Sequence, residues 1–471
     1  MGVITKSSFL SFSSEPSVRF DFLFNNLITK LNEDYYTHKE LFDIIEYEKL
    51  DISDLSTFKY AEIGNVEKTG DVNPVELSYS DRNEANESLF KKIEKGDIIK
   101  PVKGDILISA IRPYLNKNVL INNDNIYFTK AFIQIRPKIN SSIFYYTLRN
   151  NFFKNLNAVS RQGKGYPTLK DFDLKTIRYP KKSIDKLIEN QEKLIKKITP
   201  IEKEIKELKE SKKQDLEIIN AVFGKEFSFD WDKFEELKSE KIFKSSLIEY
   251  SNNVDCRYSY KFHNVAGKYV YDFLISKTKK QIKDFVSEPI VLGKSVSPKD
   301  YDADGEYFYI AMSNIKTWAF EEEGCKKVKK EYWSINLNKT VEKNDIILAR
   351  SGEGTIGKVA LIEDEDIKAI FADFTQRIRL IDYNHRLAYY YFRSDLFQYL
   401  VYTHKKGLGN NTNIFPSQIQ EFPIPDWSDK KQNEIVKKIK SKIDAQKEID
   451  NKILDKQNEI SKLIENAIKQ N

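Results

Sequence analysis

The sequence contains little cysteine and little histidine. Among 471 residues the only cysteines are Cys256 and Cys325, and the four histidines are His38, His263, His385 and His404. Two cysteines exclude a disulfide framework and a cysteine-based zinc site. Such sparing use of cysteine is typical of proteins that fold in a reducing cytosol.

Long hydrophobic runs are also absent. No stretch approaches the ~20 apolar residues that a membrane-spanning helix needs, and residues 1–20 lack the apolar core of a signal peptide. Hydrophobic residues make up 40% of the chain and charged residues 31%, with a mean hydropathy of −0.56. We therefore expect a soluble, cytoplasmic, globular protein. Its net charge of +6 permits nucleic-acid binding without requiring it.

Motifs of catalytic sites are missing or incomplete. No G-x-S-x-G or H-E-x-x-H pattern occurs. Residues 352–358 (GEGTIGK) have the spacing of a phosphate-binding loop, but Val359 stands where that loop needs Ser or Thr for magnesium. Asp345, Glu353 and Lys358 could form a carboxylate-and-lysine nuclease site, although such triplets are frequent in so charged a chain. We predict no catalytic centre and no metal site.

An internal repeat with a period near half the chain is the most informative feature. Residues 103–121 (KGDILISAIRPYLNKNVLI) return as residues 343–362 (KNDIILARSGEGTIGKVALI), and residues 144–156 (FYYTLRNNFFKNL) return as residues 388–400 (AYYYFRSDLFQYL). Weaker matches in the same order join residues 17–22 with 255–260 and Asn65 with Asn314. Several ordered matches at nearly one offset indicate a duplication.

Each repeat ends in a segment that lacks glycine and is rich in Lys, Glu and Ile. Residues 182–223 and 428–470 place apolar residues at spacings of three and four, which predicts a coiled-coil seam. Pro200 is expected to kink the first helix. Because a long helix with a narrow seam is unstable alone in water, we expect the two to pack together. The predicted helix-pairing residues are Leu187, Leu194, Ile198, Ile201, Ile205, Leu208, Ile435, Ile439, Ile449, Ile453 and Ile460.

The segments between the helices predict two globules. Short apolar runs bounded by turn residues indicate strands, and the segments that carry Tyr145, Tyr146, Tyr389 and Tyr390 have helical spacing with aromatic faces turned to a core. Strands and helices alternate without a regular βαβ rhythm, so we predict an α+β fold of two tandem, pseudo-repeated globules, each followed by a long helix. The predicted domains are residues 1–180, 181–224, 225–426 and 427–471.

This ordered set, present twice, resembles the specificity (S) subunit of type I restriction–modification systems over roughly residues 17–470. The strand-loop-strand elements, the loops before a proline-ended strand and the helix openings carry the resemblance, at residues 103–113, 343–362, 163–180, 405–425, 191–198 and 432–439. The chain departs from the family pattern before each helix, where the usual proline-leucine-proline run is reduced to RYPKK and PIPDWSD.

The resemblance implies a DNA reader without catalysis. Each globule would be a target recognition domain for one half of a split, asymmetric sequence in double-stranded DNA, and the helices would pair antiparallel as a spacer. Two methyltransferase (modification) subunits and endonuclease–translocase (restriction) subunits are the implied partners. S-adenosylmethionine, ATP and magnesium would belong to those partners, with no cofactor in this chain.

Candidate DNA-binding residues are the polar and basic side chains on the loops of the repeat. Arg can bond bidentately to guanine and Asn or Gln to adenine, whereas Lys more often contacts phosphate. In the first half these residues are Arg112, Asn116, Lys117, Arg161, Gln162 and Lys164. In the second half they are Arg350, Ser351, Thr355, Lys358, Lys405, Lys406, Asn410, Asn411 and Asn413.

Two functions of other classes stay open at this point. The chain could be a coiled-coil adaptor that holds proteins rather than DNA, or a nuclease or NTPase that uses residues 352–358. Turnover of ATP that is lost on Lys358→Ala would favour the enzyme. Salt-insensitive association without a DNA shift would favour the adaptor, because phosphate contacts make DNA affinity fall steeply with salt.

Overall fold

The computed structural model describes residues 34–52, 54–82, 86–149, 160–162, 167–240, 242–251, 257–352, 354–407 and 411–469. The chain forms two compact units. Unit 1 comprises residues 1–212 and 448–471, and unit 2 comprises residues 213–447. Each unit thus contains one globule together with part of both helical segments. The predicted domain boundaries, which separate globules from helices, stay a prediction.

Each unit contains the same four-stranded antiparallel sheet. Its strand order is β2-β8-β5-β6 in unit 1 and β12-β18-β15-β16 in unit 2. The strands of unit 1 are β2 (Phe42–Ile44), β8 (Phe132–Pro137), β5 (Ile106–Ser109) and β6 (Val119–Leu120). Those of unit 2 are β12 (Val291–Leu292), β18 (Thr375–Ile378), β15 (Ile346–Ala349) and β16 (Val359–Leu361). All residues of β5 and β15 are buried, as expected for central strands that are apolar throughout.

A three-stranded sheet accompanies each four-stranded one. Its order is β4-β3-β7 in unit 1 and β14-β13-β17 in unit 2, and in both the first pair is antiparallel and the second parallel. The strands are β4 (Val75–Leu77), β3 (Phe58–Ala61), β7 (Ile126–Phe128), β14 (Lys326–Val328), β13 (Tyr307–Ile310) and β17 (Ala369–Phe371). The duplication and the α+β fold predicted from the sequence are therefore confirmed.

The remaining elements of unit 1 are short strands and helices around these sheets. They are β1 (Tyr35–Tyr36), α3 (His38–Leu41), η1 (Ile63–Asn65), η2 (Tyr79–Asp81), α4 (Glu87–Glu94), η3 (Pro113–Leu115), α5 (Ser141–Thr147), β9 (Arg161–Gln162), β10 (Pro167–Thr168), α7 (Asp171–Lys175), β11 (Tyr179–Pro180), α8 (Lys181–Glu189) and α9 (Gln191–Ser211). The Asn140 side chain caps α5 by accepting a hydrogen bond from the amide of Ile143, at 3.1 Å.

Unit 2 has a larger helical part. Its helices are α10 (Asp215–Phe227), α11 (Trp231–Ser239), α12 (Leu247–Ser251), α13 (Val265–Lys277), η5 (Ile282–Asp284), η6 (Pro298–Asp300), η7 (Met312–Ile315), α14 (Lys330–Ile335), η8 (Leu337–Lys339), α15 (His385–Arg393), α16 (Asp395–His404) and α17 (Pro416–Gln420). Asn384 caps α15 through the amide of Leu387, as Asn140 caps α5. Helix α18 (Asp429–Lys469) runs from unit 2 into unit 1.

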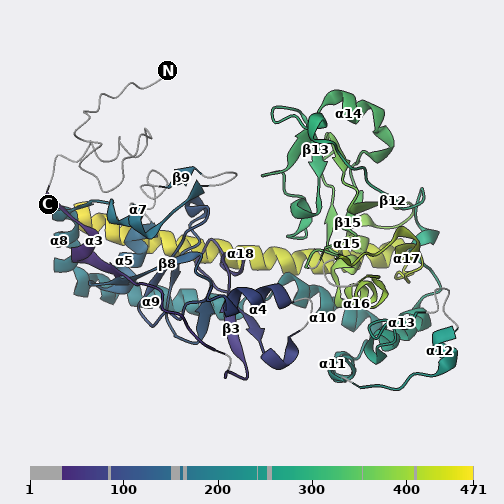
Figure 1. Cartoon of the computed structure of the whole chain (residues 1–471), viewed down its shortest axis with the longest axis horizontal. Helices are drawn as coiled ribbons and strands as arrows, with labels where there is room; N and C mark the ends of the chain where they lie inside the picture. Colours follow the sequence, from purple (N-terminus) through teal and green to yellow (C-terminus); the bar gives the residue numbers. More distant parts are fainter. Residues whose placement is uncertain are drawn as a thin grey trace. The chain divides into compact units, whose positions relative to one another are not determined.

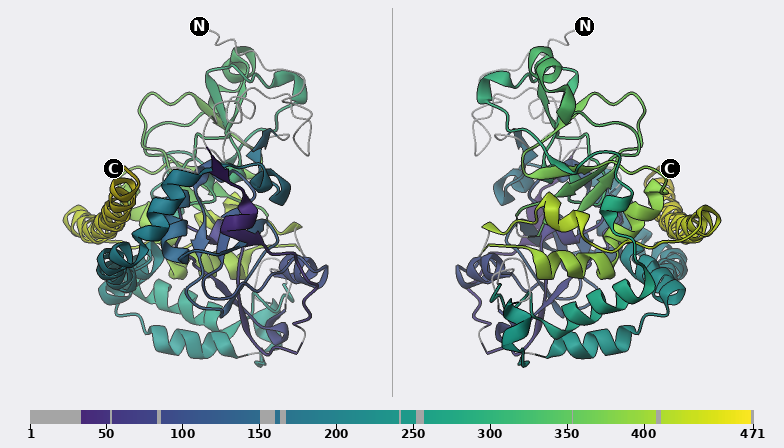
Figure 2. Two further views of the ribbon diagram at one scale, coloured as in Figure 1. Left: turned by 90° about the vertical axis from the view of Figure 1, so that its left-hand side faces the viewer. Right: turned by 90° about the vertical axis from the view of Figure 1, so that its right-hand side faces the viewer.

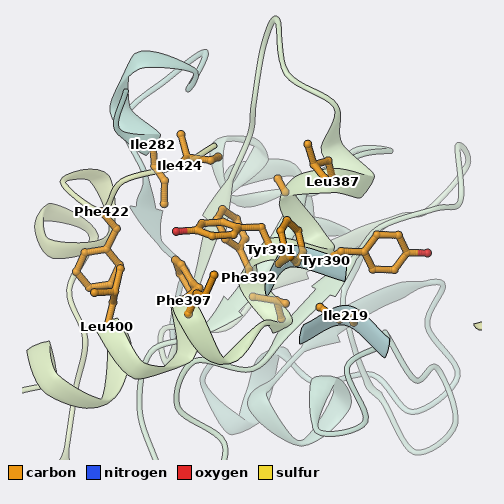
Figure 3. Packing of buried hydrophobic residues seen from close by; sticks show 14 of the residues in the cluster. Ile219, Ile282, Leu387, Tyr390, Tyr391, Phe392, Phe397, Leu400, Phe422 and Ile424 are labelled. Carbon is orange, nitrogen blue, oxygen red and sulfur yellow. The ribbon is translucent and has the colours of Figure 1, made fainter. Parts of the chain in front are cut away.

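The core of unit 2 is rich in aromatic side chains from α15 and α16. Phe392 and Phe397 lie with ring centroids 4.5 Å apart, and Phe397 also contacts Phe422 at 5.7 Å. Figure 3 shows these rings meeting Tyr391 and Leu400. Tyr145, Tyr146 and Tyr390 are at most 6% exposed, and Tyr389 is partly buried against the same core, so the prediction that these tyrosines belong to the core is confirmed.

The two helical segments pair antiparallel within each unit. In unit 1 the Nζ of Lys186 donates to the carbonyl of Ile468 at 3.3 Å, Glu204 pairs with Lys456 at 2.7 Å, and Lys212 pairs with Asp450 at 2.7 Å. Partner numbers fall as residue numbers rise, which defines the antiparallel direction. Helices α9 and α18 run side by side in Figures 1 and 2.

The predicted seam residues lie in the apolar cores. Buried in unit 1 are Leu187, Leu194, Ile198, Ile201, Ile205, Ile453 and Ile460. Leu208 and Ile449 are half-buried against the same cluster. In unit 2, Ile435 and Ile439 pack with the apolar face of α10. The alternating spacing of three and four thus corresponds to one buried stripe on each helix.

The first helical segment differs from the single long helix that we predicted. It consists of α8, α9 and α10, with a break at Asn190 and another at residues 212–214. The Asn190 side chain donates to the carbonyl of Lys186 at 2.9 Å, a local bond that competes with helix continuation. Lys212 is extended, with ψ 136°. Pro200 lies inside α9 and ends no helix.

Candidate nucleic-acid interface

A buried aspartate organises the start of the strand-loop-strand element in each unit. Asp105 Oδ2 accepts from the Val102 amide at 3.0 Å, and its Oδ1 accepts from Arg136 Nε at 2.8 Å. Asp345 accepts from the Glu342 amide at 2.8 Å and from Arg379 Nε at 2.7 Å. Both aspartates are at most 1% exposed. The preceding residue is left-handed in both repeats, with φ 92° at Gly104 and 74° at Asn344.

In unit 1 the connection between β5 and β6, residues 110–118, carries three of the predicted DNA-binding residues. Arg112 and Asn116 are left-handed, with φ 50° and 55°, and Arg112 is exposed. Lys117 Nζ donates to the carbonyl of Ile63 at 3.3 Å. Burial, with the nearby charge of Lys68 as a second cause, lowers the pKa of Lys117. Lys117 thus has a partner inside unit 1.

In unit 2 the equivalent connection between β15 and β16, residues 350–358, is held mostly by internal bonds. The buried Ser351 hydroxyl donates to the carbonyl of Thr412 at 3.1 Å, and the Thr355 hydroxyl donates to that of Ser351 at 2.9 Å. Lys358 Nζ donates to the carbonyl of Lys316 at 2.8 Å. Burial, followed by repulsion from Lys316, lowers the pKa of Lys358.

The second predicted loop of each unit lies directly beside the first. In unit 1 the amide of Leu169 donates to the carbonyl of Ala110 at 2.8 Å. In unit 2 the amide of Ile414 donates to the carbonyl of Arg350, also at 2.8 Å. Among the described residues, two stretches that are about 60 residues apart in sequence therefore lie side by side in each unit. They are residues 110–118 with 167–169 in unit 1, and residues 350–352 and 354–358 with 411–414 in unit 2.

Several predicted residues of the second loops are used internally. Arg161 pairs with the buried Asp173 at 2.9 Å. Lys405 is 7% exposed, with its ammonium 5.6 Å from the Tyr402 ring centroid. Lys406 and Asn413 exchange both backbone hydrogen bonds, at 2.7 and 2.8 Å.

Other candidates remain available to a ligand or cannot be placed. Asn411 is exposed, and the Arg350 guanidinium lies 5.7 Å from the Phe415 ring centroid, half-buried. Lys164, Asn410 and the side chain of Gln162 lie outside the described residues.

These contacts narrow the predicted reading surface. A side chain engaged with a buried carboxylate or a backbone carbonyl must lose that bond before it can contact a base. Arg161, Ser351, Thr355 and Lys358 are therefore better placed to shape the loops than to contact DNA. Arg112, Lys406 and Asn411 are exposed or half-exposed on the loops. Arg112 and Lys406 also have partners within the protein, and contact of all three with DNA stays a proposal.

Sequence reasoning overlooked residues that support the loops from beneath. Arg257 donates to the carbonyls of His404 and Lys405, both at 2.9 Å, where residues 405–414 begin. Tyr145 and Arg149 contact carbonyls of residues 116–118. Arg257 and Arg149 both lie in segments that the sequence repeats. An arginine that recurs at the repeat offset could therefore have identified these supporting residues from the sequence.

The nucleotide-binding alternative finds no matching local structure. Residues 352–358 connect two antiparallel strands, β15 and β16, whereas a phosphate-binding loop leads into a helix. The same glycines also fit G-x-G-x-x-G, which needs a helix at the same place. Asp345 is paired with Arg379, and Glu353 is outside the described residues. Within the described ranges no cluster of His, Cys, Asp and Glu could hold a metal ion, and no helix there could span a membrane.

Comparison with known proteins finds one family model that matches part of the chain. Residues 275–459 match the family described as type I restriction modification DNA specificity domain. This match confirms, over those residues, the resemblance drawn from the sequence. No curated protein matches the sequence.

Solved structures of similar proteins cover most of the chain at low identity. The HsdS subunit from Thermoanaerobacter tengcongensis is 14% identical, with 93% of this chain and 96% of that chain covered and a TM-score of 0.30. The type I restriction–modification S subunit from M. genitalium is 12% identical, with the same coverage and a TM-score of 0.33. A chain from an assembly of the type I R-M system is 13% identical, with 92% and 96% covered and a TM-score of 0.32. At identities and TM-scores this low, the role of a residue in those structures cannot be assigned to a residue of this chain.

Proposed function

We propose, from the match of residues 275–459 to the family described as type I restriction modification DNA specificity domain, that this chain is the DNA-reading specificity subunit of such a system. It would read a split, asymmetric target with one unit for each half. The chain itself would supply no catalytic step. The function would be selection of the sequence on which partner subunits act.

The duplicated loop pair is the observation that supports this proposal. Each unit presents two adjoining loops at the end of a central strand whose residues are all buried. Sequence readout requires side chains that are held in register with base edges, and loops on a rigid scaffold meet that need. Because the two units share a fold but differ in loop residues, they would read two different half-sites.

The chemistry would belong to the partners. We propose two methyltransferase subunits and the restriction subunits as partners besides double-stranded DNA. S-adenosylmethionine, ATP and magnesium would bind to those subunits. The paired helical segments, exposed and lysine-rich outside their apolar seam, are the proposed docking surface.

Methylation-sensitive sequencing tests the proposal. The chain is co-expressed with the methyltransferase encoded beside it, and the host DNA is compared with DNA from cells that lack this chain. We expect a methylated motif in two parts, separated by unread base pairs, that disappears without the chain. An intact complex of the two proteins that methylates no split motif would contradict the proposal and favour the adaptor.

A further inference from the structure

Tyr145 and Arg149 contact the first reading loop, residues 110–118, from its inner side. The Tyr145 hydroxyl donates to the carbonyl of Asn118 at 3.1 Å. Arg149 Nη1 donates to the carbonyl of Asn116 at 3.1 Å and to the Tyr145 hydroxyl at 3.2 Å. Tyr145 lies in α5 and Arg149 lies two residues past its end, and the hydrogen bond between their side chains joins them.

The carbonyls that Tyr145 and Arg149 bind belong to the loop of residues 110–118, whose backbone includes two left-handed residues. Arg112 and Asn116 are left-handed non-glycine residues, which cost free energy and persist only where neighbours impose them. Asn118 adds a second restraint, since its Oδ1 accepts from the Ser109 amide at 3.0 Å. Its Nδ2 donates to Asn116 Oδ1 at 2.8 Å. Tyr145 and Arg149 thus stabilise the strained end of the loop.

The turn at residues 67–71 closes the same cluster. Arg149 Nη2 donates to the carbonyl of Lys68. A Cβ on Gly70 would lie 2.2 Å from the Tyr145 hydroxyl and 2.9 Å from the carbonyl oxygen of Asn118. Gly70 is also left-handed, with φ 89°. Only glycine therefore lets this turn approach so closely.

Unit 2 repeats the pair with a different contact. Arg393 Nη1 donates to the Tyr389 hydroxyl at 3.0 Å, at the same spacing as in unit 1. The Tyr389 hydroxyl donates to the carbonyl of Trp318, which is left-handed, with φ 64°. Gln398 Nε2, from α16, donates to the loop carbonyl of Gly357 at 2.8 Å. Each unit thus supports its loop from the following helices.

We propose that Tyr145 and Arg149 are positioning residues for readout by unit 1, and that they set the shape of residues 110–118 without contacting DNA. This proposal rests on the proposed function, because the loop matters only if it reads bases. Removing either residue would free the loop backbone. The half-site read by unit 1 would then become less specific, while the half-site read by unit 2 would not change.

The first experiment measures the loop without DNA. Amide hydrogen exchange is compared between the full-length protein and the Tyr145→Phe variant, which loses only a hydroxyl. We expect exchange across residues 112–118 to become roughly fivefold faster or more, the loss expected for one hydrogen bond, with no change in residues 354–358. Tyr146→Phe is the matched control, because Tyr146 is as buried as Tyr145, 6% against 5%, and no bond joins its hydroxyl to the described loop carbonyls. Equal exchange in both variants would overturn the proposal.

The second experiment measures readout in the complex with the methyltransferase. Arg149→Ala should relax the methylated motif at one half-site only, and Arg149→Lys should restore part of it because one donor remains. Gln398→Ala, which removes the donor to the loop carbonyl of Gly357 in unit 2, should affect the other half-site alone. Faster loop exchange with an unchanged motif would overturn the positioning role. A wild-type complex that methylates no split motif would overturn the proposed function. The exchange experiment would still decide whether Tyr145 and Arg149 hold residues 110–118 in shape.

Discussion

Single residues that recur in both repeats anchor the fold around the reading loops. Asp105 and Asp345 each join a backbone amide to an arginine, Arg136 within β8 and Arg379 directly after β18, and both carboxylates are buried. A buried carboxylate is tolerated only when such donors satisfy it. Removing its charge weakens the bond to the arginine and with it the strand-loop-strand element.

Asp345→Asn should therefore destabilise the protein. The amide keeps one acceptor oxygen but loses the ion pair with Arg379, which then keeps Glu288 and Glu342, at 3.5 and 3.2 Å, as counter-ions. We expect a loss of about 1–3 kcal/mol in the free energy of unfolding, the range for hydrogen bonds to a charged group. Urea unfolding at pH 7 measures this loss. Asp304→Asn, at an exposed position, is the control and should change stability by less than about 0.5 kcal/mol. Equal effects of the two substitutions would contradict the role given to Asp345.

His404 gives a second prediction at this scale, which concerns how stability depends on pH. Burial lowers the pKa of His404 to about 4, while an unfolded histidine titrates near about 6.5. As pH falls below about 6.5 the unfolded chain gains a proton that the folded chain does not bind until pH reaches about 4. The stability that comes from keeping His404 neutral is therefore fully present above about pH 6.5. As pH falls from about 6.5 to about 4, the free energy of unfolding decreases by about 3 kcal/mol in total.

Urea unfolding of wild type and His404→Phe at pH 7, 6 and 5 tests this. Phenylalanine suits a site among Phe262 and Phe422, whose rings lie 5.2 and 4.9 Å from the imidazole. We expect the variant to lose less stability on acidification than the wild type. Other titrating groups contribute to both curves alike. A difference between the curves that stays constant with pH would show that His404 does not titrate as expected.

At the scale of elements, the helix pair depends on a narrow apolar seam. Leu194, Ile198, Ile201 and Ile205 of α9 are at most 7% exposed. Fully burying such a side chain stabilises the folded state by about 1.5–3 kcal/mol. The outer face of α9 carries lysine and glutamate, whose exposed ion pairs contribute little.

Ile198→Asp combined with Ile205→Asp should separate the helices in unit 1. Two charges placed in an apolar seam without partners should cost at least about 4 kcal/mol. Limited trypsin digestion should then cut within α9, and methyltransferase binding should be lost. The control replaces Lys196 and Lys203, exposed at the same seven-residue spacing, with Asp. Unchanged protease resistance in the seam variant would rule out the seam as the main contact.

At the scale of the whole molecule, the proposed spacer makes a geometric prediction. One heptad inserted into α9, with another at the facing point of α18, keeps the seam in phase and lengthens the pair by about 10 Å. At 3.4 Å for each base pair, the gap between half-sites should widen by about three base pairs while both half-sites stay the same. Sequencing of methylated DNA measures the gap. A heptad in α9 alone is the control for damage by insertion, and an unchanged gap would refute the spacer role.

Much of this organisation could be predicted because it rests on local chemistry or on repetition. The repeat of residues 103–121 as 343–362 can be read directly from the sequence. The strands follow from short apolar runs bounded by turn residues, and the seam follows from apolar spacings of three and four. The break at Asn190 could not be predicted, because a helix-compatible pattern continues through it and a single side-chain bond decides the outcome.

The sequence by itself determined the duplication, the α+β class, the seam and the two loops of each repeat, since each depends on residues that are neighbours along the chain. Only the tertiary structure decided which loop residues are available. Arg161 and Lys358 have the chemistry of DNA contacts, yet the fold brings them to Asp173 and to the carbonyl of Lys316. A side chain's role depends on its nearest partner in space, and those partners lie 12 and 42 residues away in sequence.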